Sequence, residues 1–259
     1  MKTTFAAVSA VAVAAVLTAQ PSIATAPLSP AQAQDGGRCR LPGPYELPHA
    51  GQPVNLRPDD FTTKIDNVYW PMRPGTIWRY VEKVGNATEH IKVRVTHRTK
   101  MIRGIKTRVV RDTVTEGGEL VEDTRDWFAQ DSGGSLWYLG ENTKEYDNGE
   151  FVGTEGSFEY GKHGAQAGVI IPAESRPGCA YREEFKRGEA EDRARILSTK
   201  ASIKAPTGFY HRMLNTANIT PLEPKILEHK FYARHVGPVL ELGISPKPSR
   251  AVLVKMTRH

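Results

Sequence analysis

Cysteine is scarce in this sequence, with only Cys39 and Cys179 among 259 residues. Two thiols cannot form a disulfide-rich scaffold or a four-thiolate zinc site. Long apolar runs are missing beyond the N-terminus, and the mean hydropathy is -0.45, which excludes a protein with several membrane-spanning helices. No phosphate-binding glycine loop, G-x-S-x-G, H-E-x-x-H or C-x-x-C pattern occurs, so nucleotide-binding enzymes, serine hydrolases and zinc proteases lack their strongest signals.

A large excess of charge is lacking too, since 35 Lys and Arg oppose 29 Asp and Glu for a net charge of +6. Basic residues alternate with acids, as in residues 182–189, which is typical of a solvated surface rather than a nucleic-acid stripe. The eight histidines are scattered. His229 and His235 could meet across a hairpin, but single imidazoles are the favoured interpretation. We therefore expect no nucleic acid, no metal and no cofactor.

Residues 1–33 are typical of a secretion signal. Lys2 supplies positive charge, and Phe5–Leu17 is an apolar run that is too short to cross a bilayer. Ala31-Gln32-Ala33 predicts cleavage directly after it, with Ala24-Thr25-Ala26 as the second choice and a retained anchor as the alternative. We expect a secreted, extracellular protein without stable membrane insertion.

Export also bears on the two cysteines. An oxidising compartment favours a disulfide between Cys39 and Cys179 over a catalytic thiol. The bond would join an N-terminal arm to the body of the protein, because residues 34–68 are rich in proline, glycine and polar residues and show little periodicity. The expected organisation is thus a signal (1–33), an extended arm (34–68) and a single antiparallel β domain (69–259).

Period-two alternation is the main signal after the arm. In Glu89–His97, Ile91, Val93 and Val95 share one face, and the turn residues Gly85-Asn86 precede them, which predicts a hairpin with Trp78–Val84. About ten to twelve strands follow from this pattern. They predict an all-β, mainly antiparallel meander that curves into a barrel or half-barrel, with a sandwich as the alternative. The predicted strands include 105–115, 120–130, 136–141, 151–160, 209–217, 228–233, 238–242 and 251–256, and residues 189–197 are ambiguous, with strand favoured from Arg193.

Several local patterns resemble one group of proteins. Pro71–Tyr80 follows P-x-x-x-G-x-x-W-x-Y, Ala205–Phe209 resembles a P-x-G-x-[FY] turn and strand, and Phe231–Val239 follows [FW]-Y-A-x-x-V-G-x-V. The chain thus resembles uncharacterised exported bacterial β-domain proteins whose half-barrel is similar to that of lipoprotein carriers. The resemblance spans roughly residues 69–256 and implies a curved antiparallel sheet and export, without a specific activity.

Aromatic residues suggest the leading function. The concave side of a half-barrel could form a pocket, although filling of the core is a competing explanation for the same residues. The first hypothesis is therefore a secreted monomer that binds a small apolar or amphipathic ligand, or an envelope glycan or other envelope component. The candidate ligand-binding residues are Trp127, Trp137, Tyr138, Glu159 and Tyr160.

Carboxylates between residues 126 and 192 suggest an alternative. Glycan cleavage needs one protonated and one ionised carboxyl group beside aromatic platforms. Glu141, Glu189 and Asp192 are the catalytic candidates for such a hydrolase or lyase, although solvated strand faces explain the same pattern. A third hypothesis is a protein–protein interaction or inhibitor module that uses exposed loops such as Gly161–Gly168.

Overall fold

The computed structural model describes residue 39 and residues 42–258. The expected signal and both of its cleavage sites lie outside the described residues. In the described part, no helix is long and apolar enough to cross a membrane.

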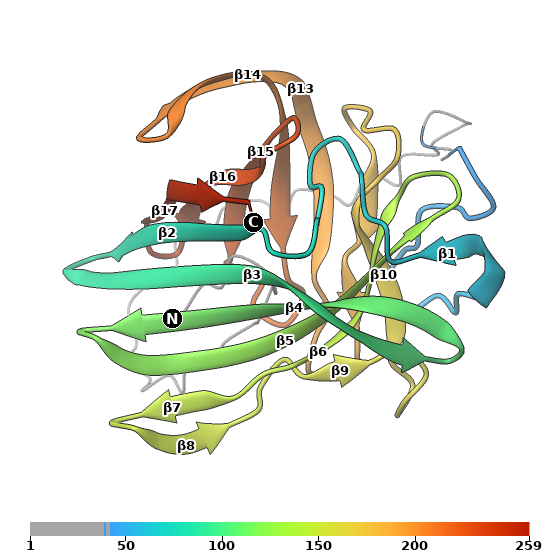
Figure 1. Cartoon of the computed structure of the whole chain (residues 1–259), viewed down its shortest axis with the longest axis horizontal. Coiled ribbons are helices and arrows are strands. Elements are labelled where there is room, and N and C mark those ends of the chain that lie inside the picture. The colour runs from blue at the N-terminus through green and yellow to red at the C-terminus, as the bar shows by residue number, and fades with distance from the viewer. Residues whose placement is uncertain (1–38, 40–41, 259) are drawn as a thin grey trace, which may run out of the picture.

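The described residues form one 17-stranded sheet in which every ladder is antiparallel (Figure 1). One short 3₁₀-helix precedes the first strand. The elements are η1 (Pro58–Asp60), β1 (Phe61–Thr62), β2 (Ile77–Val84), β3 (Ala87–Ile102), β4 (Ile105–Glu116), β5 (Glu119–Asp131), β6 (Leu136–Asn142), β7 (Glu145–Asp147), β8 (Glu150–Gly153), β9 (Phe158–Glu159), β10 (Gln166–Ile171), β11 (Ala180–Arg182), β12 (Glu184–Phe185), β13 (Arg193–Ala205), β14 (Gly208–Ile219), β15 (Leu227–Ala233), β16 (Gly237–Ser245) and β17 (Ser249–Thr257).

The ladders run almost completely around a barrel. Strands β2 to β6 pair in order, strands β13 to β17 pair in order, and β17 pairs with β2. On the other side β6 pairs with β10. The predicted all-β, antiparallel, barrel-like fold is confirmed.

A seam remains where the ring closes. The segment 180–185, here called the bridging strand, pairs with β13 through Ala180–Arg182 and with β10 through Glu184–Phe185. Gly168 of β10 allows this close approach, because a Cβ at that position would overlap the carbonyl group of Glu183. The wall is therefore joined at the seam by two short ladders rather than one long one.

The β2–β3 hairpin shows how alternation builds the wall. Trp78, Tyr80 and Glu82 of β2 are buried, whereas the residues between them face outward or are partly exposed. Gly85 takes a φ of +57° at the turn, which glycine adopts without steric cost. Sequence alternation predicted this pairing, and the register joins Ile77 to Arg94 at one end and Val84 to Ala87 at the other.

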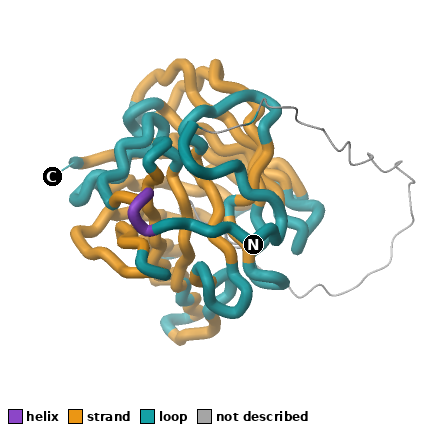
Figure 2. Tube along the Cα trace, turned by 90° about the vertical axis from the view of Figure 1, so that its right-hand side faces the viewer, coloured by secondary structure: helices purple, strands orange, loops and turns teal. Residues whose placement is uncertain are grey.

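The N-terminal arm crosses the outside of the seam. The Arg182 guanidinium of the bridging strand donates to the carbonyl oxygens of Ala50, of Gln52 (2.8 Å) and of Ala167 in β10 (2.7 Å). Loops and the short helix lie across this side of the strands in Figure 2. Arg182 thus ties the arm, the bridging strand and β10 together.

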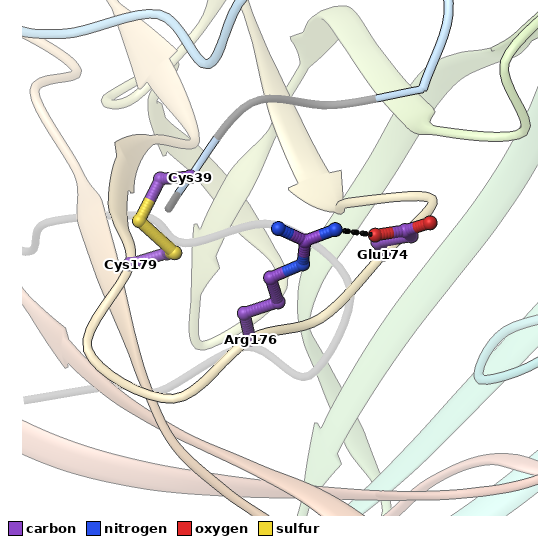
Figure 3. Close-up of a disulfide and its surroundings, with 4 residues drawn as sticks. All are labelled: Cys39, Glu174, Arg176 and Cys179. Carbon is purple, nitrogen blue, oxygen red and sulfur yellow. Dashed lines mark hydrogen bonds and ion pairs between the residues drawn. A yellow bond between two sulfur atoms is a disulfide. The ribbon is translucent and has the colours of Figure 1, made fainter. Parts of the chain in front are cut away.

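The disulfide between Cys39 and Cys179 is present, with 5.4 Å between the Cα atoms (Figure 3). Cys179 directly precedes the bridging strand. The same loop carries an ion pair between Arg176 and Glu174. The bond therefore fixes the start of the arm to the seam.

Two expected local features are wrong. Residues 151–160 are not one strand, because β8 ends at Gly153 and β9 begins only at Phe158, with a turn between them. The expected exposed loop 161–168 is exposed only in its first half, since β10 begins at Gln166 and residues 167–171 are buried. The preference for strand from Arg193 is confirmed by β13.

Candidate functional site: a buried acidic interior

Carboxylates from nearly every wall of the barrel are buried together. None is more than 7% exposed, and each appears in one connected set of electrostatic interactions with its neighbours. We call these eleven residues the interior acidic set: Glu82, Glu89, Asp112, Glu122, Asp126, Glu141, Glu183, Glu184, Asp192, Glu228 and Glu241.

Strand register explains how one side of the set is assembled. Lys230 of β15 is opposite Glu241 of β16, Glu241 is opposite Ala251 of β17, and Ala251 is opposite Glu82 of β2. Glu82 is in turn opposite Glu89 of β3. Like charges opposite each other on a sheet repel, so this row is electrostatically costly unless some carboxyl groups are protonated or a cation lies nearby.

Lys230 is the basic residue within the set. Its ammonium group lies 3.9 Å from Glu228 and 3.8 Å from Glu241. Although burial lowers its pKa, the surrounding carboxylates, Glu241 first, raise the pKa by more, and the net shift is upward. One fixed positive charge therefore faces many carboxyl groups.

The opposite wall contains a tyrosine between two carboxyl groups. Asp126 of β5 is opposite Glu141 of β6. The hydroxyl oxygen of Tyr138 lies 2.8 Å from Asp126 Oδ1 and 2.7 Å from Glu141 Oε2. A tyrosine hydroxyl has one proton to donate, so two short hydrogen bonds to it require that one of the carboxyl groups carries a proton.

The bridging strand brings the acids of the seam into the same set. Glu183 accepts a hydrogen bond from the Asn218 side-chain amide at 2.7 Å. Glu184 is 0% exposed, and neither of its carboxyl oxygens has a hydrogen-bond partner. Asp192 and Glu141 are the largest influences on its pKa after burial itself. Glu184 is thus a buried acid without a hydrogen bond.

Burial raises the pKa values of several members of the set. It raises the pKa of Glu82 to about 8, with Glu89 adding to the effect. Burial also raises the pKa values of Asp126 and Glu183 to about 7. The pKa of Glu184 lies well above its usual range, because burial and the charges of Asp192 and Glu141 act together. Several of these groups therefore titrate near neutral pH.

The predicted ligand-binding residues do not share one site. Tyr138 lies in the interior. Trp137, its neighbour in β6, points the other way. Its indole N–H donates to Asp131 at 2.8 Å, and its ring lies 5.5 Å from that of Tyr45 in the arm.

Trp127 and Glu159 share a contact with Lys100, whereas Tyr160 contacts the arm. Lys100 lies 3.2 Å from the centre of the Trp127 ring and 2.8 Å from Glu159. The hydroxyl of Tyr160 donates to the backbone of Val54 in the arm at 2.8 Å. Trp127 and Glu159 thus contact Lys100, and Tyr160 is hydrogen-bonded to the arm.

The predicted catalytic residues divide in a similar way. Glu141 and Asp192 both belong to the interior acidic set. Glu189 lies at the surface, where it forms an ion pair with Lys186 at 3.1 Å. Sequence reasoning missed Glu82, Lys230 and Glu241, although each is in phase with buried apolar residues of its own strand.

In the described ranges, no three His, Cys, Asp or Glu side chains are placed to hold a metal ion. The site consists of buried carboxyl groups, the tyrosine hydroxyls among them and Lys230.

Comparisons with known proteins add little. No family model matches the chain, and no curated protein matches it. A solved structure described as a "putative lipoprotein" from Parabacteroides distasonis is similar, with 13% sequence identity and a TM-score of 0.41. The match covers 74% of this chain and 99% of that one. A likeness this distant bears on neither fold nor function.

Proposed function

We propose that this protein is an exported barrel that binds a small amphipathic ligand and holds its positively charged group among the interior acidic set. The disulfide supports a place outside the cytoplasm, because such bonds persist in oxidising compartments. The expected signal at residues 1–33 points the same way.

Glu184 is the observation that carries the proposal. A buried polar group without a hydrogen bond costs on the order of 1–3 kcal/mol, and an ionised one costs more. In the bridging strand, an apolar side chain would avoid this cost. An acid at this position is explained if a cationic group of a ligand lies against it.

The tyrosine residues among the acids favour an organic cation as the ligand. Tyr80, Tyr138 and Tyr232 are all at most 2% exposed and lie within the electrostatic reach of the acids. Carboxylates combined with aromatic rings are the usual means of binding amines and guanidines in proteins. The seam offers a path for the ligand, since it is joined by ladders of only two and three residue pairs.

Calorimetric titration tests the proposal with spermidine, agmatine and dodecyltrimethylammonium as probes and with dodecanol and succinate as neutral and anionic controls. We expect at least one cation to bind, and Glu184→Gln to weaken its binding by about tenfold or more. The exposed Glu155→Gln should change nothing. Because Gln has nearly the shape of the protonated acid and exchanges one unpartnered polar group for another, the empty variant should be about as stable as the parent, which separates lost binding from lost folding.

Failure of all three cations to bind would overturn the proposal, and so would equal binding by the Glu184→Gln and Glu155→Gln variants. The glycan-active and interaction-module hypotheses stay predictions. Release of reducing sugars from a polysaccharide panel, with Glu141→Gln as the inactive control, tests the first of these.

A further inference from the structure

A separate pocket of about 740 Å³ lies between the arm and the barrel. The segment 63–76 forms one side, Arg108 of β4 a second, and the β15–β16 turn at His235 together with Arg258 the third. Its volume is within the range of small-molecule sites, roughly 300–1,000 Å³.

Basic side chains dominate this pocket. Lys64, Arg73, Arg108 and Arg258 line it, whereas Asp66 is its single acid. Asp66 is already engaged, since Lys64 lies 3.7 Å from it and the Gln130 side-chain amide donates to it at 2.7 Å. Among the described residues, no carboxylate lies within ion-pair distance of Arg73, Arg108 or Arg258. Three guanidinium charges are thus left without an acidic partner.

Arg108 is held in position by neutral groups. Its guanidinium donates to the carbonyl oxygen of His97 at 3.2 Å and, more weakly, to those of Thr96 and Thr63 at 3.4 and 3.5 Å. Its Nε is buried and has no acceptor. Burial lowers the pKa of Arg108, and no opposite charge counteracts it. Carbonyl oxygens orient the guanidinium without neutralising it, so an anion could still pair with it.

Apolar side chains line the rest of the pocket. Pro71 and Pro74 are partly exposed there, and Ile65 and Met72, which are buried, also belong to the lining. A free inorganic anion would leave this apolar surface unused, whereas an organic anion would cover it.

We propose that this pocket binds an organic anion, with its carboxylate or phosphate facing Arg73, Arg108 and Arg258 and its apolar part against Pro71 and Pro74. Planar guanidinium groups form paired hydrogen bonds with either anion, so the two share one recognition chemistry. The site lies apart from the interior acidic set and takes a ligand of opposite charge, so it does not depend on the function proposed above.

Calorimetric titration with decanoate, dodecyl phosphate, inorganic phosphate and dodecanol tests this inference. We expect one or both organic anions to bind, inorganic phosphate to bind at least tenfold more weakly, and dodecanol not to bind. The exposed variants Arg73→Gln and Arg258→Gln should each weaken binding about tenfold, and Arg250→Gln, an exposed arginine outside the pocket, should leave it unchanged.

The comparison of decanoate with dodecyl phosphate identifies the preferred anion. Glu184→Gln should leave anion binding unchanged, which distinguishes this pocket from the interior. Equal binding of dodecanol would show an apolar pocket only and would overturn the inference, as would unaltered binding by both Arg73→Gln and Arg258→Gln.

Discussion

At the scale of single residues, acids occupy positions where alternation places the core. In β2 the pattern Trp78-x-Tyr80-x-Glu82 sets an acid in phase with two buried aromatic residues. In β3, Glu89 is likewise in phase with Ile91 and Val93. The interior acidic set is thus visible in the sequence as charge on the apolar face of alternating strands.

That signal is easy to misinterpret. The alternation of acids and bases in residues 182–189 predicts a solvated surface, yet Arg182, Glu183 and Glu184 are buried. These residues are buried because the barrel closes around them, and no local sequence pattern shows where the barrel closes. Glu141 and Asp192 could be selected from the sequence as acids, but their convergence near Glu184 depends on strands and turns far apart in the chain.

The interior acids predict an unusual pH dependence of stability. Burial raises the pKa of Glu82 from 4.5 to about 8, so the folded state binds more protons than the unfolded state between these values. Stability is therefore highest near pH 4.5 and falls as pH rises towards 8. The charged groups around Glu82 are Glu89, Glu228, Lys230 and Glu241, of which Lys230 alone opposes the shift.

Urea unfolding at pH 5, 6.5 and 8 measures this effect. We expect the free energy of unfolding to drop by a few kcal/mol, in order of magnitude, from pH 5 to pH 8. Glu82→Gln should reduce the drop and stabilise the protein at pH 8, whereas the exposed Glu119→Gln should alter neither. A free energy of unfolding that is flat or rises with pH would contradict the prediction.

At the scale of elements, predictability follows strand length. The long strands β2 to β5 and β13 to β17 were predicted from alternation, because each repeats the period several times. Strands β8, β9, β11 and β12 have two to four residues, too few to show a period. The buried run of β10 lacks polar alternation because both of its faces are covered. These missed elements include both parts of the bridging strand.

The disulfide predicts how the seam is stabilised. The bond spans 140 residues, and closing a loop of that size stabilises the folded state by about 5 kcal/mol in the chain-entropy model. Reduction should therefore lower the urea midpoint and speed up hydrogen exchange in the bridging strand more than in β3 or β4. Exchange mass spectrometry with and without reductant measures both regions in one experiment.

A double variant, Cys39→Ser with Cys179→Ser, is the matched control. It should behave in oxidising buffer as the parent does after reduction, and added reductant should not change it. Equal protection of the bridging strand in the oxidised and reduced parent would show that the arm holds the seam without the bond. Arg182 and its contacts with Ala50 and Gln52 would then be the main link.

At the scale of the whole molecule, the fold separates charge between inside and outside. Among the described residues, eleven of the 28 acids lie in the interior set, and Lys230 is the member of the 32 Lys and Arg that lies with them. The other described residues carry 31 basic side chains against 17 acidic ones, of which Arg182, Asp123 and Asp131 are also buried. The barrel-like fold was predicted from strand count and alternation, yet this separation could not be, because a net charge of +6 does not show which acids are buried.

A surface this basic should adsorb to anionic membranes. We expect binding to vesicles of equal phosphatidylglycerol and phosphatidylcholine at low salt, and none to phosphatidylcholine alone. Binding should vanish by about 0.3 M salt, since the screening length there is below about 8 Å. Co-sedimentation with vesicles measures it. Glu184→Gln should adsorb like the parent, because its change lies inside the barrel, whereas adsorption that persists at high salt would mean that apolar insertion, and not surface charge, holds the protein.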